Sequence, residues 1–293
     1  MPFSPAQGYA FLTVTLWSSA FVFTKVALLA FTSPALGFLR CLVASVVLCG
    51  LLAVKRVPLP RLRDVPGLLL SGALGFAIYL LVFNKGSETL TSTTGCIIIA
   101  TAPLITALLA TAFFRERLSP VGWCALCLEF GGVLVLMLWN GVFSLNIGIV
   151  WMLAASLSIS AYNLVQRLFA RRYTSLELTA WSFVAATVML LPFAPEAARE
   201  TARAPLGQIA TVVFLGVFPS AVAYLAWARA LAVARSTSEV THFMFLTPFL
   251  SLILGYAVIS EVPGPETFIG GAVILLGLAL FHGAGRRTVR KPS

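Results

Sequence analysis

The chain has 293 residues, of which 59% are hydrophobic and 10% are charged, and its mean hydropathy is +0.97. One soluble core cannot hold so many apolar side chains, so this composition predicts a membrane protein and excludes an ordinary globular one. The formal net charge is +10, but most basic residues are bunched between apolar runs, which indicates membrane topology rather than a nucleic-acid partner.

Apolar runs of about 20 residues, the length that about 30 Å of hydrocarbon requires of a helix, follow one another along the chain. The runs are continuous and do not alternate with polar residues, which excludes a membrane β-barrel. The predicted fold class is an all-α membrane protein with ten transmembrane helices. These span Gly8 to Leu29, Ser33 to Leu52, Pro66 to Phe83, Ser92 to Phe114, Pro120 to Leu138, Ile147 to Gln166, Ser175 to Phe193, Leu206 to Ala228, Ser238 to Ile259 and Glu266 to His282.

The charges between these runs are distributed unequally over the two sides of the membrane. With the N-terminus in the cytoplasm, the other side receives only Lys85, Arg199 and Arg203. Because basic loops stay on the cytoplasmic side, this asymmetry predicts that both termini are cytoplasmic. The cytoplasmic basic residues would be Lys55, Arg56, Arg61, Arg63, Arg115, Arg117, Arg167, Arg171, Arg172, Arg229, Arg235, Arg286, Arg287, Arg290 and Lys291.

The second half of the chain repeats the pattern of the first. A shift of 145 positions places Pro103 on Pro248 and Glu116 on Glu261, and a shift of 142 places Lys25 on Arg167. We interpret this as a duplicated five-helix unit, residues 1–143 and 144–293. Five is odd, so the second unit must be inverted in the membrane. Inverted repeats predict a substrate site near the midplane and a transporter that works by alternating access.

Several short motifs carry a family resemblance. The motifs are Leu16 to Phe21 followed by Lys25, Leu39-Arg40, and the paired segments Thr101 to Pro103 and Leu246 to Pro248, which lead to Glu116 and Glu261. On these motifs the chain resembles the EamA-type members of the drug/metabolite transporter (DMT) superfamily over essentially its whole length, and within them it is most similar to bacterial aromatic amino acid exporters.

The resemblance implies a multi-pass protein of the bacterial inner membrane whose central cavity is lined by helices 1, 3, 4, 6, 8 and 9. On those helices, aromatic and polar residues share faces at helical spacing, which suits an amphipathic or aromatic solute. Helix packing or an interfacial belt is the alternative role for such aromatic residues. The cavity candidates are Trp17, Tyr79, Thr101, Tyr162, Asn163, Ser220, Tyr224, Trp227, His242 and Phe245.

Charged residues inside apolar runs need a reason, since each costs roughly 2.5 to 3.5 kcal/mol at a helix centre on insertion scales. Lys25 and Arg40 lie near the outer ends of helices 1 and 2, where they could snorkel to the interface or attract a substrate carboxylate. Glu129 could be a proton site or a structural acid. For Glu261, the start of the following helix is the nearest candidate for compensation.

Prolines occupy corresponding positions within helices. Pro103 and Pro248 lie in helices 4 and 9, and Pro219 lies in helix 8. Each removes a backbone donor and so frees the carbonyl four residues earlier. Such residues can form hinges or gates, or only static bends.

No pattern indicates chemistry on a substrate. The motifs of metalloproteases and serine hydrolases do not occur, and His242 and His282 form no chelating pair. We expect no cofactor, no metal and no enzyme activity. The sequence predicts an exporter of amino-acid-like metabolites, with aromatic amino acids favoured, that functions as a single chain. An exporter of other amino acids, nucleosides or drugs, or a flippase or channel, remains the alternative.

Overall fold

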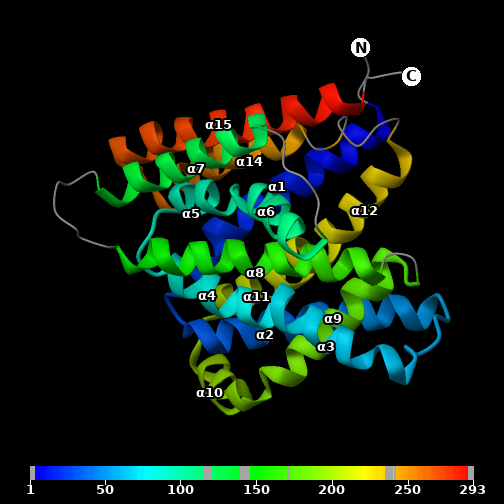
Figure 1. The fold of residues 1–293 in the computed structure, drawn as a ribbon. Helices are drawn as coiled ribbons and strands as arrows, with labels where there is room; N and C mark the ends of the chain where they lie inside the picture. The colour runs from blue at the N-terminus through cyan, green and yellow to red at the C-terminus, as the bar shows by residue number, and fades with distance from the viewer. Residues whose placement is uncertain are drawn as a thin grey trace.

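A computed structural model describes residues 4–114, 120–138, 146–169, 172–234, 240 and 242–289, and these residues are organised almost entirely as helices (Figure 1). Within them, six helices are long and apolar enough to cross a membrane, and a bent helix pair makes a seventh. Three further helices are also apolar but shorter. Each of the ten predicted ranges overlaps one of these ten segments. The six are Pro5–Ala27, Ser33–Val54, Leu62–Ser87, Ser92–Phe114, Ile147–Phe169 and Leu206–Val233; the pair is Ser175–Met189 with Leu191–Arg203; the shorter three are Pro120–Leu136, Phe243–Ile259 and Pro265–Phe281.

The first half of the chain begins with a well-capped helix. The Ser4 hydroxyl accepts a hydrogen bond from the backbone N–H of Gln7, whose side chain in turn accepts one from the Ser4 N–H, so two free donors at the helix start are satisfied. The helices are α1 (Pro5–Ala27), α2 (Ser33–Val54), α3 (Val65–Gly72), a π-helical turn (Ala73–Ala77), α4 (Ile78–Ser87), α5 (Ser92–Ile99), α6 (Ala102–Phe114) and α7 (Pro120–Leu138), with a 3-10 turn (Leu62–Asp64) before α3.

The second half has the same order of helices as the first, and the short helix α10 is added to it. Thr174 and Glu177 form a capping box at the start of α9. The elements are α8 (Ile147–Phe169), α9 (Ser175–Met189), a 3-10 turn (Leu191–Phe193), α10 (Ala194–Arg203), α11 (Leu206–Val217), a π-helical turn (Phe218–Val222), α12 (Ala223–Val233), a 3-10 helix (His242–Leu246), α14 (Thr247–Ile259) and α15 (Pro265–Val289).

The seventh predicted range, Ser175 to Phe193, differs from the structure at its end. Helix α9 stops at Met189, and the chain then bends by 54° into α10. Pro192 explains the stop, because proline cannot donate the next helical hydrogen bond. Helix α10 is polar on one side, and Glu196 and Glu200 accept hydrogen bonds from Thr32 at the start of α2. The sequence pattern alone did not reveal this short helix.

The interval found in the sequence recurs in the backbone. The two π-helical turns begin at Ala73 and Phe218, which are 145 positions apart, and helices α6 and α14 begin at Ala102 and Thr247, which are separated by the same number. In the second half, Pro219 lies inside the π-helical turn and removes a backbone donor there. Both halves therefore interrupt their third and fourth helices at equivalent positions.

Helices from the two halves pack against one another. Helix α1 packs against α12 and α14, α2 against α9, α4 against α8, and α7 against α15. The α7–α15 pair lies side by side along one edge of the molecule (Figure 1). Glycines allow the close approach: a Cβ on Gly132 would lie 2.7 Å from the backbone oxygen of Gly270. The core between the halves includes Phe76, Tyr162 and Phe183.

Candidate functional site

A cavity of about 600 Å³ lies between the two halves and is lined by residues of both. Most of its wall is aromatic or aliphatic, and a few hydroxyl, amide and charged groups are set among these side chains. That composition is typical of a site for a small amphipathic molecule. The aromatic residues of the wall are Trp17, Phe21, Phe76, Tyr79, Phe83, Tyr162, Phe183, Tyr224, Trp227 and Phe245.

The sequence-predicted cavity residues largely meet at this wall. Thr101 is an exception: it is buried, and its hydroxyl donates to the Ile98 carbonyl at 2.7 Å and lies 3.0 Å from the Ser156 hydroxyl. The His242 side chain lies outside the part of the chain that the structure describes. The predicted residues at the wall are Trp17, Tyr79, Tyr162, Asn163, Ser220, Tyr224, Trp227 and Phe245.

Aromatic contacts hold the wall together across the two halves. The Trp17 ring lies 5.6 Å from Tyr224, edge to face, and 5.4 Å from Trp227. The Phe76 ring stacks on Phe183 at 3.6 Å and meets Tyr162 edge to face at 5.3 Å. Offset and edge-to-face pairs stabilise aromatic clusters beyond simple burial. The wall is thus a packed structure with defined ring orientations.

Arg40 lies in this wall with only 4% of its surface exposed. One guanidinium nitrogen donates to the Thr24 hydroxyl at 3.1 Å, and the guanidinium carbon lies 6.0 Å from the centre of the Phe83 ring. Nε has no hydrogen-bond partner among the described residues. Lys25, which the sequence grouped with Arg40, lies elsewhere and has a different partner.

The cavity extends toward one end of the molecule. Its lining includes Gln166 and Ser175, which flank the connection from α8 to α9, and Leu231 near the end of α12. The start of α1 lies at this same end, because Ala6 packs with Ala230. The cavity therefore reaches toward the side on which the N-terminus lies.

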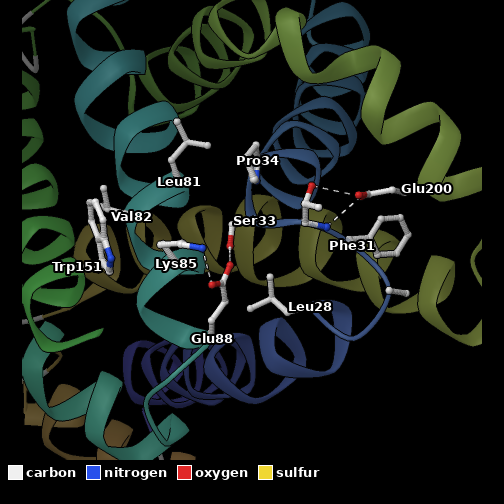
Figure 2. A pocket seen from close by; sticks show the side chains of 12 residues that line it. Leu28, Phe31, Ser33, Pro34, Leu81, Val82, Lys85, Glu88, Trp151 and Glu200 are labelled. Carbon is white, nitrogen blue, oxygen red and sulfur yellow. Dashed lines mark hydrogen bonds and ion pairs between the residues drawn. The ribbon is translucent and has the colours of Figure 1, made fainter. Parts of the chain in front are cut away.

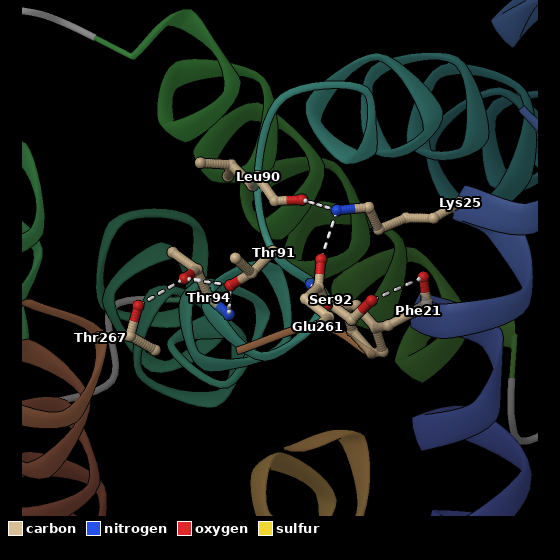
Figure 3. Close-up of polar contacts among 8 residues, drawn as sticks. All are labelled: Phe21, Lys25, Leu90, Thr91, Ser92, Thr94, Glu261 and Thr267. Carbon is tan, nitrogen blue, oxygen red and sulfur yellow. Dashed lines mark hydrogen bonds and ion pairs between the residues drawn. The ribbon is translucent and has the colours of Figure 1, made fainter. Parts of the chain in front are cut away.

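Polar contacts close the opposite end (Figure 3). The Lys25 ammonium forms an ion pair with Glu261 and donates to the Leu90 carbonyl at 2.8 Å. The other oxygen of Glu261 accepts the backbone N–H of Ser92, the first residue of α5, at 2.7 Å. A carboxylate is stabilised there by the free donors and the positive end of the helix dipole.

The expected partner of Glu261, the helix that begins at Pro265, is therefore not the one that the structure shows. Ser260 adopts a left-handed conformation, with φ 53°, and turns the chain back after α14. This turn directs Glu261 toward Lys25 and α5. A partner 236 positions away in the sequence could not have been read from local spacing.

A second hollow, of about 650 Å³, lies beside the connection from α1 to α2 at this closed end (Figure 2). Its charged groups are already paired: Lys85 contacts Glu88 at 2.7 Å, and Ser33 donates to the other Glu88 oxygen at 2.6 Å. Glu200 accepts the backbone N–H of Thr32 at 3.0 Å. The polar groups of this hollow are therefore already engaged by neighbouring groups of the protein.

The remaining predicted residues are the three prolines and Glu129. Pro103 and Pro219 line the cavity, whereas Pro248 is buried as the second residue of α14 and is not part of the described lining. The carbonyl of Leu215, which Pro219 leaves without a helical donor, accepts the Ser220 hydroxyl at 2.8 Å. Glu129 is 2% exposed, packs against Gly277 of α15, and lies away from the cavity.

Helix α9 and the break between α5 and α6 also contribute to the site. Ser175, Thr179 and Phe183 line the cavity at intervals of four, a stripe that was visible in the sequence but lay on a helix not expected at the cavity. At the break, the Thr101 carbonyl accepts hydrogen bonds from the backbone N–H groups of Leu104 and Ile105. The carbonyls of Ile99 and Ala100 receive no hydrogen bond from the described residues. Within the described part of the chain, no group of three potential metal ligands occurs.

Comparison with known proteins gives consistent matches. The model of the EamA-like transporter family matches residues 5–138 and 146–282. A probable terminal-alkyne amino-acid exporter of Streptantibioticus cattleyicolor is 32% identical over 99% of this chain and 96% of its own length. An S-adenosylmethionine/S-adenosylhomocysteine transporter of Chlamydia trachomatis is 27% identical over 93% of this chain and 87% of its own. One crystal structure shares the fold, with a TM-score of 0.64, 19% identity, and coverage of 96% of this chain and 98% of the other.

Proposed function

The chain belongs to the EamA-like transporter family, and from this premise we propose that it exports small amino-acid-like metabolites, with aromatic amino acids as the preferred substrates. Membership of the family makes it a multi-pass membrane transporter of small metabolites and not an enzyme. The choice of amino acids, and of aromatic ones among them, is the step that we add.

The proposed architecture is that of two inverted five-helix repeats, residues 1–143 and 144–293, with ten membrane crossings. Both termini would lie in the cytoplasm of a bacterial cell, and the protein would reside in the inner membrane. Since both halves of the cavity come from one chain, we propose that a monomer is sufficient for transport. The recurrence of the π-helical turns at the repeat interval supports the duplication.

The observation that carries the proposal is the aromatic cavity between the halves. An aromatic ring can stack on side chains such as Trp17, Tyr79 and Tyr224, while the polar groups of Asn163 and Ser220 can orient the rest of the molecule. The described lining contains no carboxylate, which disfavours a lipophilic cationic drug as the substrate.

Relatives support amino-acid-like substrates in general. One is named a probable exporter of a terminal-alkyne amino acid, and another is named a transporter of S-adenosylmethionine, which also contains an amino acid group. A nucleoside-bearing metabolite is therefore the second candidate substrate class. The volume of about 600 Å³ is within the usual range for sites that bind small molecules.

Alternating access would require the closed end to open. In the structure, the cavity reaches the N-terminal side while Lys25 and Glu261 close the other side, as expected of a state that loads substrate from the cytoplasm. We propose that Pro103, Pro219 and Pro248, at the interruptions of the helices, act as hinges between this state and an outward-open one.

The function can be tested by flux measurements on purified protein in liposomes. The panel comprises aromatic, aliphatic, hydroxylated and thiol amino acids, nucleosides, and one cationic drug. We expect tryptophan, tyrosine and phenylalanine to be transported fastest. Flux confined to the cationic drug would refute the proposal, and flux confined to nucleosides would favour the second substrate class.

Variants of aromatic residues test the position of the site. We expect Trp17→Ala and Tyr224→Ala to reduce aromatic amino acid flux strongly, because each removes a ring from the cavity wall. Trp123→Ala is the matched control, since this tryptophan is 50% exposed on α7 and is not part of the described lining. Equal loss of flux in all three variants, at equal protein amounts, would contradict this position of the site.

A further inference from the structure

Arg40 introduces a positive charge into a cavity that holds no described negative one. The other described residues of the wall are apolar, aromatic or neutral polar. Arginine keeps its charge in proteins, and a buried charge without a counter-ion is costly. Water in a cavity open to one side reduces this cost but leaves the guanidinium free to exchange water for an anion.

The described carboxylates are engaged or located elsewhere. Asp64 pairs with Arg172, Glu88 with Lys85, and Glu261 with Lys25. Glu129 is buried between α7 and α15, and Glu177 caps α9. Glu196 and Glu200 accept hydrogen bonds from Thr32, and Glu266 lies in the first turn of α15. Within the described residues, therefore, no acidic side chain is within ion-pair distance of Arg40.

Arg40 is nevertheless held in a defined position. The bond to Thr24 fixes one nitrogen, and the Phe83 ring lies 6.0 Å from the guanidinium carbon. Nε is buried and has no partner among the described groups. A guanidinium offers donors in a planar fork that matches a carboxylate, so a fixed arginine with a free donor is suited to bind one.

We propose that Arg40 binds the carboxylate of the transported molecule and thereby selects α-amino acids over their uncharged or amine analogues. This inference rests on the proposed function and names the residue that determines its specificity. The same wall contains the free carbonyls of Ile99 and Ala100, which can accept hydrogen bonds from an ammonium group. The aromatic side chains Tyr79, Phe83 and Tyr224 then surround the body of the substrate.

The experiment measures binding and counterflow with a series of phenylalanine analogues. The probes are L-phenylalanine, L-phenylalaninamide, phenethylamine and 3-phenylpropanoate, with the full-length protein in detergent for binding and in liposomes for flux. For the wild type, we expect phenylalanine to bind more tightly than its amide by about tenfold to a hundredfold, the range for a hydrogen bond between charged groups. Phenylpropanoate should compete, and phenethylamine should not.

Arg40→Gln should lose this discrimination, so that phenylalanine and its amide bind with similar affinity, and Arg40→Lys should restore part of it. Arg199→Gln is the matched control, because Arg199 is exposed on α10, and it should behave like the wild type. Equal binding of acid and amide by the wild type, or unchanged discrimination in Arg40→Gln, would overturn the assignment of Arg40. If the glutamine variant does not fold, Arg40→Lys is compared with the wild type: weaker discrimination between acid and amide supports the assignment, and unchanged discrimination overturns it.

The outcomes separate this inference from the proposed function. Failure of the wild type to bind or transport any amino acid would refute the function itself. If the protein transports phenylalanine but binds phenylalanine and its amide equally well, the proposed function stands and only the role of Arg40 is refuted.

Discussion

The two cations of the first two helices have different surroundings although the sequence presents them alike. Lys25 and Arg40 both lie in apolar runs near the same membrane side, and spacing alone could not separate snorkelling from a functional role. In the structure, Lys25 meets Glu261, while Arg40 faces the cavity without a described counter-ion. The difference arises from residues far away in the chain. It suggests that Lys25 helps to close the cavity and that Arg40 binds the substrate.

The ion pair provides a prediction about the closed end. Removing one partner of a partly buried pair leaves the other charge uncompensated, so Glu261→Gln and Lys25→Gln should weaken the seal. Cys96 lines the cavity and can report this opening when Cys41, Cys49, Cys124 and Cys127 are replaced by serine. We expect a membrane-impermeant maleimide added from outside to label Cys96 several-fold faster in both variants.

The control for this experiment is Glu88→Gln. Glu88 also forms an ion pair, with Lys85, but it lines the second hollow and is 34% exposed. Its substitution should leave Cys96 labelling unchanged. The exchanged pair Lys25→Glu with Glu261→Lys should restore closure only in part, since lysine cannot accept the backbone N–H of Ser92. Labelling at the wild-type rate in both single variants would disprove the gate.

At the scale of single elements, helices α7 and α15 illustrate how small residues determine packing. A Cβ on Gly132 would lie 2.7 Å from the Gly270 oxygen and 3.0 Å from the Ile274 nitrogen, so backbone atoms would have to move. We therefore expect Gly132→Ala to destabilise the protein by about 1 to 3 kcal/mol, the usual range for overpacking. The measurement is the thermal transition of the purified protein in detergent.

Gly131 provides a neighbouring control for this prediction. A Cβ at Gly131 would meet no described atom within 4 Å. Gly131→Ala should therefore leave the transition unchanged or raise it slightly, because alanine favours the helix more than glycine. Equal transitions in the two variants would show that α7 and α15 do not pack as closely as described.

The whole molecule combines its two halves in one helical assembly. Several pairs of contacting helices, such as α2 with α9 and α7 with α15, take one member from each half. The cavity consequently exists only when both halves are present. This arrangement explains why neither half offers a complete site by itself and why a conformational change of one half relative to the other would alter access.

The orientation of the whole molecule in the membrane gives the last prediction. From the distribution of basic residues, we expect a fluorescent protein fused to either terminus to fluoresce, because it folds in the cytoplasm. Alkaline phosphatase inserted after Arg203, at the end of α10, should be active, because we place this segment outside the cytoplasm. An active phosphatase at the C-terminus would contradict the proposed topology.

The sequence by itself was sufficient for the helical class, the approximate apolar ranges and the duplicated pattern, because these depend on local composition and on comparison of the chain with itself. Helical spacing also placed Trp17, Tyr162 and Tyr224 among the residues that the structure brings to one wall. Such spacing identifies residues that share a face, and for these helices the polar and aromatic face is the one that turns inward.

Only the tertiary structure decided which residues face one another. The ion pair of Lys25 with Glu261, the isolation of Arg40, the burial of Thr101 outside the cavity wall and the contribution of α9 all depend on packing between segments separated by more than 50 positions. The sequence contains Pro192, but the bend of the chain before α10 became visible only in the structure. Local periodicity describes each helix relative to its own axis, whereas charge pairing and cavity access depend on the rotation and position of every neighbouring helix.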